Sequence, residues 1–536
     1  MTHRTRPSLL AAPAAAVLLL TGCGGGDAAA GSADTSHLRV AYGWYPTCFD
    51  YAQSNPFALF GRQVLDTLLS ENPDTGELEP YLAESWEAAE DARTFEFTIR
   101  EGVTFSNGQE LTPEVVADNF TTLWDLAEQG VSTTPGTYLR GFDHAEAVDG
   151  RTVRVVFDEP NAGFLQANTE GQFGIIAPES LALSPEERCA RGTVGSGPFV
   201  LEEAVRDERV EYVRRDGYDW APASFGRTGE AALERITFQI IPEESVRAAG
   251  VLAGDHDIAY SITESGLAQA EGDERVHSVL AADRSVVNTL VVNTSDPVLS
   301  DPAVRRALQH GIDREELVST FYGEGVEPAT DVVSAGHPNH TDRGDLLAYD
   351  PGLSRSLLDE AGWTEDSEGV RSKDGRELRV SLTYVTGTIG ADASGWEYLQ
   401  SRLDDIGVRL DLSPVSDAEQ ADLQTSGDWQ LVVYQGASRG DADGIAAFYS
   451  TENTVWGAQA PRPDVDGLLA DQAAAIDPQE RRDLVDRAVT TLLEEAYGIP
   501  LYDSSQVLLV SGSVSGLTFP VNSWEPILYS VEKGRS

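Results

Sequence analysis

Two acidic residues and an arginine stand close together in the stretch 434–444. Asp441 and Asp443 are separated by one residue, and Arg439 lies two positions before Asp441. A carboxylate held away from water pairs strongly with a cation, and a guanidinium can bind a carboxylate through two parallel hydrogen bonds. We expect Asp441 to bind a positively charged group of a ligand. Arg439 could bind a ligand carboxylate, or it could pair with Asp441 or Asp443 and hold the loop. An ordinary surface loop is the other interpretation.

A calcium loop is a third interpretation of this stretch, because Asp441 and Asp443 fit its first acidic positions and Glu452 its last. However, Ile445 stands where such a loop needs a ligand, and Ala446 stands where it needs glycine. We therefore reject calcium binding and expect no metal site. The chain also has one methionine and no histidine cluster, so direct coordination of nickel is not expected.

Catalytic motifs are missing from the sequence. The chain has eight histidines but neither a His-Glu-x-x-His nor a Gly-x-Ser-x-Gly pattern. Paired carboxylates occur by chance in such an acidic chain, so they carry little weight as a sign of glycoside hydrolysis. We expect a protein that is not an enzyme and that uses no cofactor.

The composition limits the partners and the number of lobes. The 536 residues include 88 acidic and 38 basic side chains, which gives a formal net charge of -50. This charge argues against nucleic acid and against anionic lipid surfaces as partners. It could reflect a preference for cationic ligands, but it is spread over the whole chain, so we favour general surface acidity. The length predicts two or more lobes.

The order of secondary-structure signals predicts an α/β fold, because strands are interleaved with helices. Alternating or apolar runs predict strands at 38–42, 94–100, 152–157, 378–384, 408–412 and 431–434. A helix is expected after Thr112-Pro113, because threonine caps a helix and proline suits its first position. Three Asp-Pro pairs, which begin at Asp301, Asp350 and Asp477, predict three more helices, and Glu480 is placed to complete a capping box with Asp477.

The first 22 residues have the layout of an export signal. A basic stretch at 3–6 precedes an apolar run at 9–20, which is too short to remain as a membrane-spanning helix. The segment Leu20-Thr21-Gly22-Cys23 resembles the lipobox of bacterial lipoproteins, in which the cysteine is lipidated. We expect 1–22 to be a signal peptide, Cys23 to carry lipid, and 23–36 to form a flexible tether.

With Cys23 lipidated, two cysteines remain, Cys48 and Cys189. Outside the cytoplasm, a remaining pair is more often a disulfide than two free thiols. A metal site built from them would need further cysteine or histidine ligands close by in the sequence, and there are none. We predict a Cys48–Cys189 disulfide.

Five segments along the chain form a pattern that is more specific together than any one of them alone. They are Tyr81-Leu82-Ala83-Glu84-Ser85-Trp86; the run 91–108 with 111–116; Gly195-Ser196-Gly197-Pro198-Phe199; Asn293 with 301–308; and Gly311-Ile312-Asp313-Arg314. Together they resemble the bacterial extracellular solute-binding proteins of family 5, the oligopeptide, dipeptide and nickel-chelate group. The resemblance runs from about residue 38 to the C-terminus.

This resemblance implies an α/β, two-lobed fold of the periplasmic-binding-protein type, in its large peptide-binding form with an extra subdomain and a ligand cleft between the lobes. Lobe I would comprise 37–285 and 500–536, with the extra subdomain at about 62–180, and lobe II would comprise 286–499. We expect most of the quoted motifs to maintain the fold. The residues 195–198 would form a tight turn, and the helix at 305–313 would bury its apolar face and form salt bridges with its charges.

The resemblance also implies which residues bind the ligand. In peptide-binding members, a loop at the place of 434–444 carries an aspartate that pairs with the α-ammonium group of the ligand, and Asp441 falls on that position. Arg439 and Gly440 replace the aromatic and small residues that usually precede it. Further candidates for the cleft lining are Asp443, Gln53, Ser54, Asn55, Phe57, Glu170, Gln172 and Trp456.

The function implied by this resemblance is that of an extracytoplasmic substrate-binding lipoprotein of an ABC importer. It would capture a short peptide or similar small zwitterion by lobe closure and deliver it to the permease subunits. A metal chelate or another non-peptide solute is an alternative, as is a surface sensor with the same fold. We expect a monomer that contacts the outer face of the cell membrane only through its N-terminal lipid.

Overall fold

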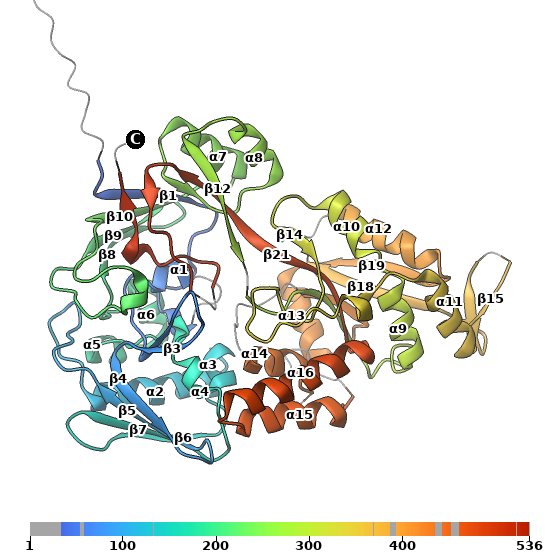
Figure 1. The fold of residues 1–536 in the computed structure, drawn as a ribbon, viewed down its shortest axis with the longest axis horizontal. Coiled ribbons are helices and arrows are strands. Elements are labelled where there is room, and N and C mark those ends of the chain that lie inside the picture. Colours follow the sequence, from blue (N-terminus) through green and yellow to red (C-terminus); the bar gives the residue numbers. More distant parts are fainter. Residues whose placement is uncertain are drawn as a thin grey trace, which may run out of the picture. The chain divides into compact units, whose positions relative to one another are not determined.

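The structure is a computed structural model (Figure 1), and it describes residues 34–53, 58–131, 133–282, 284–367, 369–385, 393–434, 442–451, 460–520 and 523–534. The strands of its main sheet are β1 (His37–Tyr42), β8 (Phe199–Val205), β9 (Arg209–Arg214), β10 (Arg235–Ile240), β11 (Ile258–Ala259), β12 (Val276–Ala282), β13 (Asn288–Val292), β14 (Val326–Pro328), β18 (Arg379–Val385), β19 (Arg409–Val415), β20 (Leu431–Tyr434) and β21 (Gly498–Ser511). Over the described residues the order is β19-β18-β20-β13-β21-β11-β1-β10-β9-β8, and β12 and β14 also pair with β21.

The main sheet is mixed, with a parallel group near each end. β1 pairs in parallel with both β10 and β11, and β18 pairs in parallel with both β19 and β20. The other pairs in the described part of this sheet are antiparallel. All five residues of the central strand β13 are buried, as expected for a strand covered on both faces.

β21 joins the two parallel groups. Its first residues, 498–502, pair with β13, and its last residues, 505–511, pair with β12. Figure 1 shows β21 as a long red strand that runs from the strands around β1 to those around β18. The chain also passes from one group to the other between β12 and β13. Two neighbouring connections therefore link the two halves of the sheet.

A second, antiparallel sheet has the order β4-β5-β7-β6. It consists of β4 (Ala83–Ala88), β5 (Thr94–Ile99), β6 (Phe142–Ala147) and β7 (Thr152–Phe157). In β5 and β7 every second residue is buried, which agrees with the alternation in the sequence. The smaller sheets are formed by β2 (Leu69–Glu71) with β3 (Leu78–Pro80), by β15 (Thr364–Glu365), β16 (Arg371–Lys373) and β17 (Arg376–Glu377), and by β22 (Val514–Ser515) with β23 (Glu532–Lys533).

The helices range from single turns to the long α16. They are α1 (Ala58–Gly61), α2 (Pro113–Glu128), α3 (Thr133–Tyr138), α4 (Phe164–Ala167), α5 (Pro178–Leu181), α6 (Pro185–Arg191), α7 (Glu244–Ala253), α8 (Glu264–Ala270), α9 (Pro302–His310), α10 (Arg314–Phe321), α11 (Pro351–Glu360), α12 (Ala393–Asp404), α13 (Asp417–Ser426), α14 (Ala442–Tyr449), α15 (Pro463–Ala474) and α16 (Pro478–Glu494). Short 3-10 turns lie at Tyr51–Gln53, Gly171–Phe173, Ala223–Phe225, Gly344–Leu347 and Leu528–Ser530. Within the described residues, no helix combines the length and the apolar character that a membrane span requires.

The predicted helix starts are confirmed by their caps. The side chain of Asp301 accepts a hydrogen bond from the Ala303 N–H (3.0 Å), and that of Asp350 accepts one from the Leu353 N–H (2.8 Å). Asp477 caps α16 by accepting from the N–H groups of residues 479 and 480 (2.9 Å each), and Thr112 caps α2. Reciprocal capping boxes occur instead at the starts of α6 and α13, where a serine and a glutamate bond each other's backbone N–H groups.

Apolar side chains gather in separate cores. The first core contains residues from 38–281 and 508–531, including the second sheet and the strands around β1. The second core lies around β18 and contains residues from 290–502. The third core is formed by residues from 286–493, including those of α14, α15 and α16. A small fourth cluster packs around α7.

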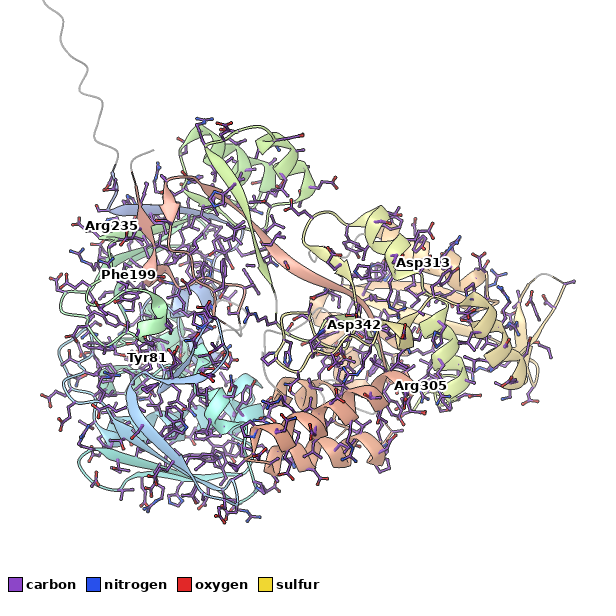
Figure 2. All side chains as sticks on the ribbon, in the orientation of Figure 1. Tyr81, Phe199, Arg235, Arg305, Asp313 and Asp342 are labelled. Carbon is purple, nitrogen blue, oxygen red and sulfur yellow. A yellow bond between two sulfur atoms is a disulfide. The ribbon has the colours of Figure 1, made fainter. Side chains whose placement is uncertain are left out.

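The segment 195–198 forms a structural turn. The Ser196 hydroxyl donates to Asp66 Oδ2 (2.9 Å), and the Gly197 N–H donates to the Val64 carbonyl (3.0 Å). A Cβ on Gly197 would lie 2.5 Å from the Val64 carbonyl carbon, so this turn requires glycine. Asp66 also accepts from Tyr81, which is labelled in Figure 2. Burial raises the pKa of Asp66, and these hydrogen bonds oppose that shift.

The helix predicted at 305–313 ends earlier than expected. α9 stops at His310, and Asp313 caps the following helix, α10. Arg305, which Figure 2 places on α9, is 3% exposed and donates chiefly to the backbone carbonyls of residues 299, 300 and 495, at 2.9 to 3.1 Å. Arg306 forms a salt bridge with Glu495, as expected for the charges of this helix, whereas Arg305 binds mainly backbone carbonyls.

Cys48 and Cys189 form a disulfide, with their Cα atoms 4.2 Å apart. The neighbouring Asp50 and Arg188 form a buried ion pair at 2.6 Å. The Phe49 N–H also donates to the Cys189 carbonyl at 3.0 Å. The segment after β1 is thereby fastened to α6 by a covalent bond, an ion pair and a backbone hydrogen bond.

Candidate functional site

The carboxyl ends of the parallel strands are the expected place for a site, because α/β sheets bind ligands outside these ends. In the first core, β1, β10 and β11 end at Tyr42, Ile240 and Ala259. In the other half of the sheet, β18, β19 and β20 end at 385, 415 and 434. The predicted ligand loop, 434–444, begins at the last residue of β20.

Arg247 of α7 holds the carboxyl ends in the first core together. Its guanidinium donates to the carbonyls of residues 241, 242, 260 and 261 at 2.8 to 2.9 Å. A Cβ on Gly43, directly after β1, would lie 3.3 Å from Arg247 Nη1. The side chain therefore contacts the segments that follow all three parallel strands. The residue is 3% exposed, and burial lowers its pKa.

Glu525 lies buried beside the end of β1. It is 1% exposed, and its burial raises its pKa to about 8, although the nearby positive charge of Arg62 opposes the shift. Burial raises the pKa values of Tyr42 and Tyr260, whose rings lie 5.2 Å apart, and a negative charge on Glu525 would add to both shifts. Glu525 is therefore mostly protonated at neutral pH, and in that form it can donate a hydrogen bond.

Glu170 and Gln172 lie buried in the same core. The charges of Glu170, Glu525 and Arg62 all act on Tyr51, so these groups share one neighbourhood. Glu170 is 7% exposed and Gln172 is 8% exposed. Gln172 Oε1 accepts no hydrogen bond within the described part of the chain. A buried carbonyl oxygen of this kind is available to a donor.

Gln53 has a structural role in this arrangement. Its side-chain amide donates to Asp50 Oδ2 (2.6 Å) and to the Pro185 carbonyl (3.0 Å). The side-chain amide of Gln53 therefore donates to both parts that the disulfide joins, the segment after β1 and α6.

Asp443 lies on a helix and not in the predicted loop. α14 begins at Ala442, so Asp443 is in its first turn, where a negative charge is favourable. Its Oδ1 accepts from Gln472 Nε2 (2.7 Å), and its Oδ2 pairs with Arg481 Nη2 (3.1 Å). The expectation of a loop at Asp443 is therefore wrong, because the residue lies in α14, and its contact with a ligand stays a prediction.

A cavity of about 230 Å³ lies beside Asp443, between the first and the third core. One wall comes from 137–161 and includes Arg140 and Glu159, which form an ion pair at 3.2 Å. The other wall comes from α14 and α15 and includes Asp443 and Asp466. The cavity offers charged groups of both signs from two parts of the chain.

Several predicted site residues lie outside the described residues. They are Asp441, Arg439, Ser54, Asn55, Phe57, Trp456 and the lipidation candidate Cys23. Among the described residues, no group of three or more His, Cys, Asp or Glu side chains could hold a metal ion. Sequence reasoning did not find Glu525, Arg62 or Arg247, because none of them stands in a short motif.

Comparisons with known proteins now decide the family. The profile of the bacterial extracellular solute-binding proteins, family 5 (Middle), matches residues 77–456. The chain belongs to this family.

The family-5 protein is similar to binding proteins of different solutes. The nickel-binding periplasmic protein of Escherichia coli (strain K12) is 24% identical over 477 residues, which are 87% of this chain and 88% of that one. Di/tripeptide-binding protein 2 of Pseudomonas aeruginosa (strain UCBPP-PA14) is 24% identical over 455 residues, which are 79% of this chain and 82% of that one. The crystal structure of NikA from Brucella suis in complex with Fe(III)-EDTA has a TM-score of 0.77 and 26% identity, and the match covers 92% of this chain and 99% of that one. The sequence-based prediction of the family and of its mixed α/β fold is thereby confirmed.

Proposed function

We propose that this family-5 protein is the extracytoplasmic substrate-binding lipoprotein of an ABC importer. Cys23 would carry the lipid that anchors it to the outer face of the cell membrane. The lobes would be 37–285 with 500–536 and 286–499, and they would close over the solute and deliver it to the permease. The protein would act as a monomer that binds its solute without catalysis.

The observation that carries this proposal is the cavity of about 230 Å³ between residues of two different cores. The first core and the half of the sheet that carries the third core are linked by β21 and by the passage from β12 to β13. Two strand connections allow one half to rotate about the other, and a site between them can enclose most of a small molecule.

We propose a short peptide or similar zwitterion as the solute. Asp441 would bind its ammonium group, and Arg439 is available for its carboxylate. Outside the lining of that cavity, the buried oxygen of Gln172 and the protonated carboxyl group of Glu525 offer an acceptor and a donor in the first core. Both ends of a zwitterion would thus find partners of opposite charge.

The first test is native mass spectrometry of the mature protein purified from its own host. A retained mass that fits a short peptide is expected. The second test titrates trialanine into the protein by calorimetry. Asp441→Asn should weaken binding by about 2 to 5 kcal/mol, roughly 30-fold or more, because the ammonium group would be left buried and unpaired.

The matched control is Asp428→Asn, a change of the same kind at an exposed position, which should leave the affinity unchanged. N-acetylated trialanine should bind the unchanged protein as weakly as trialanine binds Asp441→Asn. An unchanged affinity in Asp441→Asn would refute the role of this residue.

A preformed metal chelate is the second candidate solute. The relatives include a nickel-binding protein, and the NikA structure contains Fe(III)-EDTA. The described residues include no cluster that could coordinate a metal ion. A chelate brings its own metal ligands, so its binding needs no such cluster. Binding of Ni(II)-bis-histidine but not of trialanine in the same calorimetric assay would favour this candidate.

A further inference from the structure

The first and the third core meet directly beside the cavity. The Ala162 N–H donates to the carbonyl of Ala473, in the last turn of α15, at 2.7 Å. These residues are more than 300 positions apart in the sequence. Figure 1 shows α4, which follows Ala162, next to α15. This backbone hydrogen bond therefore reports whether the two cores are in contact at this point.

Three side chains of the third core form a closed network at the same place. Asp443 accepts from Gln472 Nε2 at 2.7 Å, and Arg481 Nε donates to Gln472 Oε1 at 2.8 Å. Arg481 Nη2 completes the network with Asp443 Oδ2 at 3.1 Å. The Asp443 and Arg481 side chains are 14% and 17% exposed. The network fixes the direction of the Asp443 carboxylate, because both of its oxygens have a partner.

The fixed carboxylate faces Gly163 of the first core. A Cβ on Gly163 would overlap Asp443 Oδ2 and would lie 2.9 Å from Arg481 Nη2. The backbone at Gly163 has φ -71° and ψ -11°, which any residue can adopt. Glycine is therefore needed here for the close approach of the other core and not for its own conformation.

We propose that Asp443, Gln472 and Arg481, docked against Ala162 and Gly163, form a latch that stabilises the closed arrangement of the two lobes. The proposal rests on the proposed function, because closure is the step that the latch would control. A contact made only in the closed state shifts the population towards that state and raises the apparent affinity for the solute in proportion. Asp443 would then act on binding by stabilising closure, with both of its carboxylate oxygens engaged by Gln472 and Arg481.

The test uses the ligand-free full chain and residue-resolved hydrogen exchange at the Ala162 amide. Gly163→Ala should raise its exchange rate tenfold or more, because the new methyl group and the Asp443 carboxylate cannot occupy the same space. Gly150→Ala is the matched control, because Gly150 lies between β6 and β7 and its Cβ would meet nothing within 4 Å. The control should leave the exchange rate at Ala162 unchanged.

Arg481→Met tests the latch from the other core, since it frees the Asp443 carboxylate to turn. It should also speed exchange at Ala162. The double variant with Gly163→Ala should raise the exchange rate at Ala162 by less than the product of the two single fold-changes, because both substitutions act on one contact. Unchanged exchange in both single variants would overturn the proposal.

Trialanine binding separates the latch from the proposed function. If the unchanged protein binds trialanine, Gly163→Ala should weaken binding about tenfold and Gly150→Ala should not. Equal affinity in the two variants would overturn the latch. If the unchanged protein binds no trialanine, the proposed solute is wrong, and the exchange at Ala162 still decides the latch.

Discussion

Glu525 provides a test of the buried groups at the end of β1. Its side chain is 1% exposed, and burial raises its pKa to about 8 from the ordinary value of 4.5. Between pH 4.5 and about pH 8, Glu525 is ionised in the unfolded chain but protonated in the folded protein. The free energy of unfolding therefore falls as the pH rises through this range. The stabilisation is fully present below pH 4.5 and is lost by about pH 8. One pKa unit corresponds to about 1.4 kcal/mol, so the whole window corresponds to about 5 kcal/mol.

The perturbation is Glu525→Gln, which keeps the shape of the side chain and removes its ionisation. Urea unfolding of the two proteins from pH 5 to pH 9 gives the difference in the free energy of unfolding. We expect almost no difference at pH 5 and an advantage of the variant that grows by up to about 1.4 kcal/mol per pH unit until about pH 8. Burial lowers the pKa of His256, so this group makes the free energy of unfolding rise with pH. Its contribution is the same in both proteins and cancels in the difference between them.

The exposed glutamate Glu532, whose side chain is 62% accessible, provides the control. Glu532→Gln should give no advantage that grows across this range. If the difference between Glu525→Gln and the unchanged protein stayed constant from pH 5 to pH 9, the Glu525 carboxyl group would not be held protonated by burial. Glu525 would then provide no hydrogen-bond donor at this place in the first core.

Two further predictions concern the framework. The free energy of unfolding of the double variant Cys48→Ser/Cys189→Ser, measured with urea, should be lower by up to about 5 kcal/mol, because the disulfide spans 141 positions. A thiol titration of the unchanged protein, folded and unreduced, should find neither of these two sulfhydryls free. Recovery of two free thiols would contradict the bridge. Arg247→Met should destabilise the first core by about 3 kcal/mol or more, because four backbone carbonyls lose a buried donor. Arg275→Met, which removes an exposed pair with Asp273, should lower the free energy of unfolding far less than Arg247→Met does in urea unfolding.

Local signals in the sequence predicted local structure well. The Asp-Pro pairs mark real helix starts because a cap and a proline act on the next three residues only. The alternation at 94–100 and 152–157 describes β5 and β7 because one face of each strand is buried. The cysteine pairing could also be predicted, since only two cysteines remained after Cys23.

The surroundings of Asp443 could not be predicted in this way. Its partners Gln472 and Arg481 come from the two following helices, and Gly163 comes from another core. A signal for the start of α14 was nevertheless present, because Ala442, Ile445 and Phe448 recur at a helical spacing and are buried on one face. The Asp-Gly composition of the stretch concealed that spacing.

Glu525 could not be predicted either, for a different physical reason. Nothing in the residues around it distinguishes a buried carboxyl group from the many acidic residues of the chain. Its burial depends on Tyr42, Tyr260 and other groups far away in the sequence. A strongly perturbed pKa arises from tertiary packing, so it is visible only once the fold is known.

The net charge of -50 adds a constraint on how two lobes of this protein can meet. Bringing acidic surfaces together is unfavourable unless the carboxylates at the contact are neutralised or paired. At the cavity Asp443 is paired with Arg481, Glu159 is paired with Arg140, and Asp466 accepts from the N–H groups of residues 451 and 462. Glu525, in the first core, is neutralised by protonation instead. The surface acidity is thus compensated locally, by pairing or by protonation, where the cores meet.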